Sequence, residues 1–238
     1  MSYAYAYLFG DCLLGIVWLA FFLLRKDLRH QQLFVSFFTA PFGFMQVFWF
    51  YGDYWRPEYA WTFLIRGIPF GIEEILFAFF IGGIGSVIYE VIFRKRYRPN
   101  GKKRMRSAVS IIVASAATFL LLHTFGWNSI WASTTALALA SIVMVVVDRD
   151  LRRDCIASSV LMFATIFCGY LLWLTLFPGS IARFWVADAL SGIALVGVPI
   201  EELCWFISWA MFSGIAYEFS VNAGAYTPYV QKRIRVER

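Results

Sequence analysis

Seven long apolar segments constrain this chain more than any other feature of its sequence. They are expected as helices over residues 4–24, 33–51, 69–93, 108–122, 129–147, 156–177 and 198–219. Segments of about 20 residues match the hydrocarbon thickness of a bilayer, at about 1.5 Å of rise per residue. Charged residues make up only 15% of the chain, too few for the surface of a soluble domain. The sequence therefore predicts an all-α polytopic membrane protein with seven transmembrane helices.

The basic residues are distributed unevenly among the connecting segments. With the N-terminus outside, all Lys and Arg residues except Arg56, Arg66 and Arg183 fall in the inner segments 25–29, 94–106 and 148–153 and in the C-terminal tail. Cytoplasmic loops carry such an excess of Lys and Arg. We therefore expect an outside N-terminus, a cytoplasmic C-terminus and a multi-pass protein of the cell membrane. The same distribution explains the net charge of +6 without a nucleic-acid partner.

One acidic stretch occurs twice. Glu73-Glu74 and Tyr89-Glu90 match Glu201-Glu202 and Tyr217-Glu218 at a constant offset of 128. Carboxyl groups inside an apolar run are costly, and their presence there points to a function.

The repeat extends upstream of the acidic stretch, because Lys26-Asp-Leu-Arg29 matches Arg149-Asp-Leu-Arg152. Three predicted helices precede the linking helix and three follow it, so a single link gives both copies the same orientation. The sequence thus predicts a 3+1+3 parallel tandem repeat, with units at 1–106 and 128–238 joined by 107–127. Binding sites in such repeats often lie at the interface of the two units.

Five carboxyl groups are expected in the outer half of the bilayer: Asp11, Glu73, Glu74, Glu201 and Glu202. Adjacent helical residues point about 100° apart, so only one glutamate of each pair can face a common cavity. The other is expected to pair with Arg66, with Arg183 or with a helix N-terminus. A purely structural role, as caps or anchors, is the alternative.

Glu90 and Glu218 lie about 24 Å further along their helices, too far to join the same compact site. We expect them to have a structural role at the inner end.

Aromatic residues accompany the acidic pairs and give them a possible chemistry. The set near the pairs consists of Phe70, Phe77, Phe80, Trp205, Phe206 and Trp209. A buried carboxylic acid keeps its proton more readily, and aromatic faces stabilise a desolvated cation. Such a pocket suits protonation of an alkene followed by a carbocation rearrangement, although each ring alone is equally well explained as lipid-facing. Further aromatics are expected in the outer interfacial belt, namely Tyr3, Tyr5, Tyr7, Trp55, Trp61, Trp127 and Trp185.

These motifs together resemble the membrane-bound lycopene cyclase domain family, the heterodimeric or fused carotenoid cyclase type, as two domains in tandem. The resemblance rests on Asp27-Leu-Arg29, Asp53-Tyr-Trp-Arg-Pro57, Ile72–Ile84 with Tyr89-Glu90, and Pro199–Leu203 with Tyr217-Glu218. Two departures stand out. The first copy has its proline four residues before the glutamates and the second has it two residues before. The second copy has Pro178–Trp185 in place of the Asp-Tyr-Trp-Arg-Pro loop.

The resemblance implies an isomerase that closes an acyclic carotenoid end, such as that of lycopene, into an ionone ring by a non-redox reaction. We predict that Glu74 and Glu202 face the cavity, one as acid and the other as base or cation stabiliser. Glu73 and Glu201 are expected to support them, and Asp11 and the aromatic set are expected to contact substrate. Partners would be the carotenoid, the lipid bilayer and other enzymes of the carotenoid pathway.

No cofactor or metal is predicted. The chain has no Gly-x-Gly-x-x-Gly dinucleotide motif, and its four cysteines show no Cys-x-x-Cys spacing and are expected as small buried hydrophobes. Two other functions stay open at this level. A 3+1+3 small-molecule transporter shares the architecture, and a non-catalytic carotenoid-binding membrane protein shares the pocket. A retinal protein is excluded, because no lysine lies within a predicted helix core.

Overall fold

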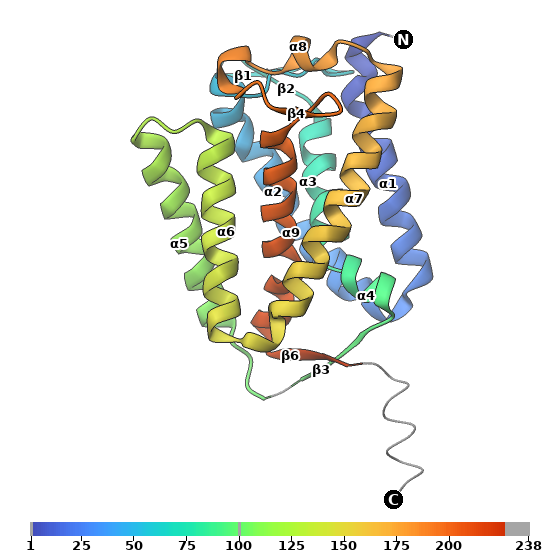
Figure 1. Ribbon diagram of the computed structural model, residues 1–238, viewed down its shortest axis with the longest axis vertical. Helices are drawn as coiled ribbons and strands as arrows, with labels where there is room; N and C mark the ends of the chain where they lie inside the picture. The colour runs from blue at the N-terminus through green and yellow to red at the C-terminus, as the bar shows by residue number, and fades with distance from the viewer. Residues whose placement is uncertain (1, 100, 227–238) are drawn as a thin grey trace, which may run out of the picture.

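The computed structural model describes residues 2–99 and 101–226, and its long helices lie lengthwise beside one another (Figure 1). The C-terminal basic residues beyond 226 lie outside the described residues. The α-helices are α1 (Ala6–Leu24), α2 (Arg29–Asp53), α3 (Ile72–Gly85), α4 (Ile88–Phe93), α5 (Met105–Thr124), α6 (Ser129–Val147), α7 (Arg152–Leu176), α8 (Ser180–Phe184) and α9 (Ile200–Val221). The short strands are β1 (Phe63–Ile65), β2 (Ile68–Phe70), β3 (Arg96–Pro99), β4 (Ala194–Leu195), β5 (Val198–Pro199) and β6 (Ala223–Tyr226).

Within the described ranges, five helical segments are long and apolar enough to cross a membrane: 3–24, 26–53, 105–124, 129–147 and 149–176. The all-α membrane class predicted from the sequence is therefore confirmed. Helix α9 has 22 residues but carries three glutamates, and α3 has only 14 residues. The count of seven spans stays a prediction.

The third predicted helix, 69–93, is wrong as a single element. Pro69 lies in β2 rather than in the first helical turn, and the helix is interrupted between α3 and α4 at Ser86 and Val87. Glycine weakens a helix by about 1 kcal/mol relative to alanine, and the end of α3 is rich in it. Gly82 serves close packing there, since a Cβ would lie 2.0 Å from Thr39 Oγ1 of α2. The seventh predicted helix likewise begins later than expected, because Val198 and Pro199 form β5.

The elements before and after α5 correspond in order. A short 3-10 helix follows α1 at Lys26–Leu28 and another follows α6 at Arg149–Leu151. Hairpin β1–β2 precedes α3, and hairpin β4–β5 precedes α9. Helix α3 packs on α2 and α1, while α9 packs on α6 and α7. Figure 1 shows α1 and α6 running in the same direction. The linking helix α5 begins at Met105, slightly before the predicted boundary of the first unit.

The basic connecting segments gather at one end of the molecule. There Arg25 donates to the backbone oxygen of Lys95 at 2.5 Å, and Arg104 forms an ion pair with Asp148 at 2.6 Å. Strand β3 pairs with β6 at the same end (Figure 1). The two hairpins and α8 lie at the opposite end, so the charge asymmetry of the sequence coincides with the two ends of the helices.

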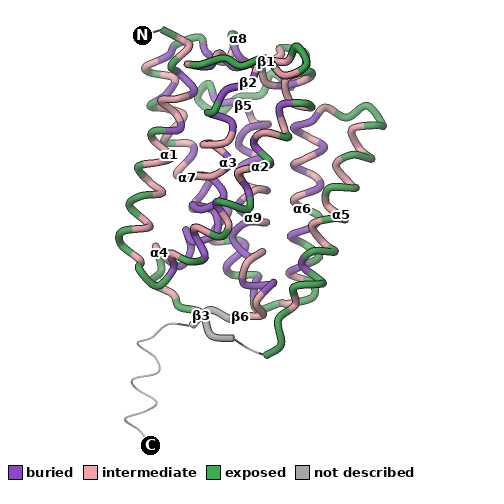
Figure 2. Tube along the Cα trace, turned by 180° about the vertical axis from the view of Figure 1, so that it is seen from behind, coloured by how far each residue is buried: buried purple, intermediate pink, exposed green. Residues whose placement is uncertain are grey.

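Burial is greatest on α3 and α9 in the middle of the molecule, whereas α5 is largely exposed (Figure 2). Cys155 is buried, but Cys12 and Cys168 are exposed, so the prediction that the cysteines are buried is wrong for these two. Cys12 lies outside the cavity lining, whereas Cys168 belongs to it.

Candidate functional site

Two hairpins with the same turn geometry lead into the acidic helices. Arg66 and Gly67 have φ values of 52° and 81°, and Val196 and Gly197 have values of 51° and 83°. Positive φ at both central residues is the requirement of a two-residue type I′ hairpin turn. Pro69 and Pro199 each lie two residues after the turn glycine, and the proline spacing differs because the first copy has two additional residues, Phe70 and Gly71, before its helix.

The first glutamate of each pair anchors a loop. Glu73 Oε1 accepts a hydrogen bond from the backbone N–H of Ala60 at 2.7 Å, and Glu201 Oε1 accepts one from that of Ser191 at 2.6 Å. Both side chains are fully buried. The expected pairing with Arg66 or Arg183 is wrong for the described residues: Arg66 is exposed, and Arg183 pairs with Glu58. The backbone N–H gives one oxygen of each carboxyl group a partner without burying a second charge, while Oε2 of Glu73 and of Glu201 has none among the described residues.

The second glutamate of the first unit, Glu74, accepts three hydrogen bonds. Tyr59 Oη donates to Oε1 at 2.8 Å, while Tyr7 Oη and Gln46 Nε2 donate to Oε2 at 3.0 and 2.8 Å. Tyr59 lies in the loop before α3. Burial and the nearby Glu74 carboxylate raise the pKa of Tyr59 well above its ordinary range, so it stays a neutral phenol that can donate.

Glu202 is held in the same manner by residues of both units. Tyr54 Oη and Trp185 Nε1 donate to its Oε1 at 2.6 and 2.9 Å, and Tyr170 Oη donates to its Oε2 at 2.5 Å. Tyr54 follows α2 of the first unit, whereas Tyr170 and Trp185 belong to the second. The carboxyl group of α9 is therefore positioned in part by a residue that precedes α5 in the chain.

The Asp-Tyr-Trp-Arg-Pro loop contacts two segments that follow α5 in the chain. Asp53 accepts from the backbone N–H and the hydroxyl of Ser129 at 2.7 and 2.5 Å, which caps the N-terminus of α6. Trp55 forms an antiparallel bridge with Trp185, and their ring centroids lie 4.2 Å apart. Trp185 ends the segment Pro178–Trp185, which corresponds in the sequence to the Asp-Tyr-Trp-Arg-Pro loop. The two corresponding segments therefore lie beside each other.

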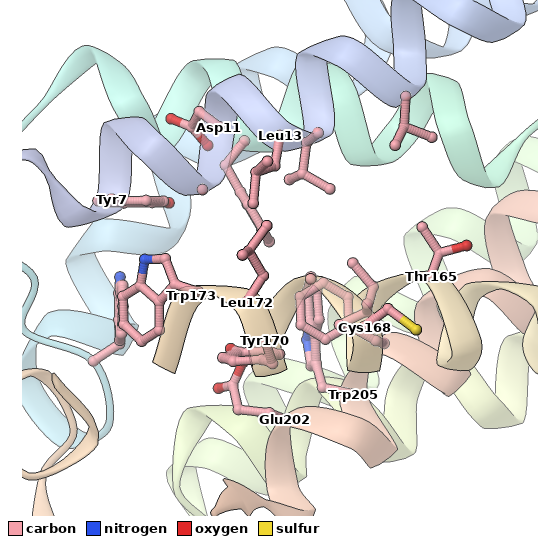
Figure 3. Close-up of a pocket in the computed structure, with 18 of the residues that line it drawn as sticks. Tyr7, Asp11, Leu13, Thr165, Cys168, Tyr170, Leu172, Trp173, Glu202 and Trp205 are labelled. Carbon is pink, nitrogen blue, oxygen red and sulfur yellow. The ribbon is translucent and has the colours of Figure 1, made fainter. Parts of the chain in front are cut away.

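A cavity of about 420 Å³ opens between α1 and α7 and reaches α9 (Figure 3). Its carboxyl groups come from Asp11 of α1 and Glu202 of α9, which lie on opposite sides of the view in Figure 3. The rest of its lining is mostly apolar and aromatic, with Gln46 and Thr165 as uncharged polar members. Such a site suits an unsaturated hydrocarbon with few polar groups.

The predicted site residues divide into two groups. Asp11, Phe77, Glu202, Trp205 and Phe206 line the cavity. The others are absent from its lining: Phe70, Glu73, Glu74, Phe80, Glu201 and Trp209.

Two of the residues outside the lining, Trp209 and Glu74, contact residues within it, whereas Phe70 and Phe80 pack elsewhere on α2 and α1. Trp209 stacks on Trp205 with ring centroids 5.7 Å apart and donates to the Ile81 oxygen at 3.2 Å. Phe80 touches α1 near Gly15, and Phe70 packs against Phe44. Glu74 adjoins the cavity through two of its donors, Tyr7 and Gln46, which line it.

Several residues of the cavity were not predicted as site residues. Tyr7, Trp55 and Trp185 were predicted in an interfacial belt, but they line the cavity, and Tyr7 and Trp185 are buried. The belt prediction fits Tyr5, Trp61 and Trp127, which are exposed. The repeat offered one signal, since Trp55 and Trp185 each follow an aromatic residue in the segment before a hairpin. Tyr54 lies in the Asp-Tyr-Trp-Arg-Pro motif itself, whereas Tyr170 and Trp173 gave no comparable signal.

These features define a class: a polytopic helical membrane protein with an aromatic cavity and buried carboxyl groups. The family model described as lycopene cyclase matches residues 4–92 and 128–220, more than half of the chain. The chain belongs to the lycopene cyclase family, with two matching segments in tandem, and the family implies an enzyme that acts on carotenoids. Comparison with curated proteins gave no match, and comparison with solved structures gave none.

Proposed function

We propose that this protein closes one end of an acyclic carotenoid such as lycopene into an ionone ring by acid-catalysed, non-redox isomerisation. The observation that carries the proposal is the placement of the Glu202 carboxyl group in an aromatic cavity open toward the lipid-facing side of the bundle. A hydrocarbon substrate offers no polar groups to bind, so such a site recognises it by shape and by aromatic contact.

The reaction needs a proton donor and a proton acceptor. A proton added to the terminal alkene leaves a tertiary carbocation, whose attack by a second double bond forms the ring bond. Loss of a ring proton then restores a double bond. Glu202 suits the acceptor, because three donated hydrogen bonds stabilise its anion. Trp205 and Phe206 present aromatic rings that favour the cationic intermediates.

The remaining glutamates support the site in this proposal. Glu74 holds Tyr7 and Gln46 in the cavity wall, whereas Glu73 and Glu201 fix the loops that precede α3 and α9. The role proposed for Glu74 differs from the predicted one, in which Glu74 faced the cavity together with Glu202, because the cavity lining includes Glu202 but not Glu74. Glu74 takes a place behind the wall rather than within it.

The substrate enters from the bilayer between α1 and α7. Ile16 and Leu172 line the cavity and are 66% and 46% exposed, so the opening faces the surroundings of the helices. Gly169 leaves room in the lining, since a Cβ there would meet no atom within 4 Å. A polyene could lie along this opening with one end near Glu202.

The wider arrangement completes the proposal. Seven spans in two parallel units, at 1–106 and 128–238 with a link at 107–127, would place the cavity in the outer half of the cell membrane. The N-terminus would lie outside and the C-terminus in the cytoplasm. Support comes from the matching order of elements in the two units and from the basic segments at one end. Other carotenoid-pathway enzymes would deliver the acyclic substrate within the same bilayer.

Expression in a lycopene-accumulating host, with chromatography of the pigments, tests the function. The expected result is a cyclic isomer with one or two ionone rings. Accumulation of lycopene with no ring product, from verified membrane-inserted protein, would refute cyclase activity. Retained lycopene binding would then indicate a binding protein, and solute uptake by reconstituted vesicles would indicate a transporter.

A further inference from the structure

Asp11 differs from every other acidic residue of the site. Its side chain is 1% exposed, and neither of its carboxyl oxygens has a hydrogen-bond partner among the described residues. It lies one helical turn after Tyr7 on α1 and belongs to the cavity lining. A buried charge without donors is very costly, so such a group stays neutral and carries its proton.

The neighbouring carboxyl group of Glu74 reinforces this state. Glu74 accepts a hydrogen bond from Tyr7, which lies one helical turn before Asp11 on α1, so this carboxyl group is held beside the same part of α1. Glu74 already receives three hydrogen bonds, which favour its own anion. A second anion beside it would be doubly unfavourable, and the proton therefore resides on Asp11.

Glu202 cannot easily take the role of donor. Trp185 Nε1–H has no acceptor function, so the Oε1 atom that receives it is best left unprotonated. Tyr54 and Tyr170 also donate to this carboxylate, so a proton on it would require one of these hydroxyls to rotate and accept. The two acids of the cavity are thus unlike in their surroundings: Glu202 is surrounded by donors and Asp11 has none.

We propose that Asp11 is the proton donor that starts ring closure, with Glu202 as the acceptor that ends it. This inference rests on the proposed cyclase function and assigns a second catalytic residue to it. The Asp11 O–H bond breaks and its proton forms a C–H bond with the terminal alkene carbon. The ring C–H bond breaks last, its electron pair forms the ring double bond, and its proton passes to Glu202. The product is an isomer of the substrate, and return of the proton from Glu202 to Asp11 resets the site.

The test compares Asp11→Asn and Asp11→Glu with the wild-type protein and with Cys12→Ser, a neighbouring exposed position outside the cavity lining. Initial rates of lycopene conversion are measured in isolated membranes at equal protein content. The midpoint of thermal unfolding is measured in detergent. Asp11→Asn should lower the rate by about 100-fold or more, the range of lost acid catalysis. Its unfolding midpoint should stay equal or rise, because an unpartnered buried acid is removed.

Asp11→Glu should restore part of the rate, and Cys12→Ser should behave as wild type. Conversion by Asp11→Asn within threefold of wild type would overturn the assignment. A lower unfolding midpoint in Asp11→Asn, with no recovery in Asp11→Glu, would overturn it too and indicate a structural role. Failure of the wild-type protein to form any ring would instead refute the proposed cyclase function.

Discussion

Replacing Glu202 by glutamine tests the site most directly, because the two side chains have nearly the same shape. The amide oxygen can keep the position that receives Tyr54 and Trp185, at 2.6 and 2.9 Å. The amide nitrogen then faces Tyr170, whose hydroxyl can rotate to accept rather than donate. The substitution removes the negative charge and the proton-accepting oxygen while it leaves each neighbour a partner.

The expected effect on activity is large and the effect on stability is small. Loss of a general base lowers rates by about 10²- to 10⁴-fold, which corresponds to about 2.7–5.4 kcal/mol of activation free energy. Exchange of three hydrogen bonds to a charged group for neutral ones should lower the free energy of unfolding by about 1–3 kcal/mol. The effect on the rate exceeds the effect on the free energy of unfolding, because the negative charge of Glu202 is needed most when the carbocation intermediate occupies the cavity.

The assay is the initial rate of ring formation in membranes of a lycopene-accumulating host, with protein quantified by immunoblot. Glu201→Gln is the matched control, since it changes the adjacent glutamate, whose single donor is the backbone N–H of Ser191. That variant should stay within about threefold of wild type, or ~0.6 kcal/mol. A Glu202→Gln variant that converts lycopene at the rate of Glu201→Gln would refute the catalytic role of Glu202.

Three further substitutions test other parts of the site. Gly169→Phe should fill the cavity opening and lower the rate of lycopene conversion by about tenfold or more, ~1.4 kcal/mol. Gly52→Phe, which is also in open space but lies outside the lining, should leave the rate unchanged. Equal rates of the two variants would refute entry of the substrate between α1 and α7. Gly43→Ala places a Cβ 2.0 Å from the Glu74 backbone oxygen and should cost about 1–3 kcal/mol of stability, and an unchanged thermal midpoint would contradict this close packing of α2 on α3. Glu74→Gln should lower the initial rate of ring formation by about tenfold, and a loss as large as that of Glu202→Gln would place Glu74 in the chemistry itself.

Much of the fold follows from patterns that act locally. The span over 129–147 was predicted with the bounds of α6, since an apolar run between a capping Asn128 and a charged turn leaves little freedom. The prediction of a single helix over 69–93 was wrong, because packing between helices determines where this segment is interrupted. Thr39 and Gly82 bring α2 and α3 together, and the glycine-rich end of α3 then gives way to a break. Contacts of this kind join residues far apart in the chain, and the hydropathy pattern does not predict them.

The acidic pairs show the same division. Their duplication marked both as unusual, and helix geometry required the two members of each pair to point in different directions. The hydrogen-bond donors to these glutamates could not be predicted from the sequence, because Tyr54 is 148 residues from Glu202 and Tyr7 is 67 residues from Glu74. The sequence does not show whether an aromatic residue anchors the protein at the membrane interface or lines a site, because that depends on its spatial neighbours.

The sequence by itself determined the membrane class, the asymmetry of basic residues and the five carboxyl groups around which the site is built. These are properties of composition and spacing, which the bilayer imposes on any chain that crosses it. The tertiary structure alone decided which carboxyl groups reach the cavity and what surrounds each. Glu202 has three donors and Asp11 has none among the described residues. Because the protonation state of a buried acid depends on its partners, only the assembled helices could distinguish the two.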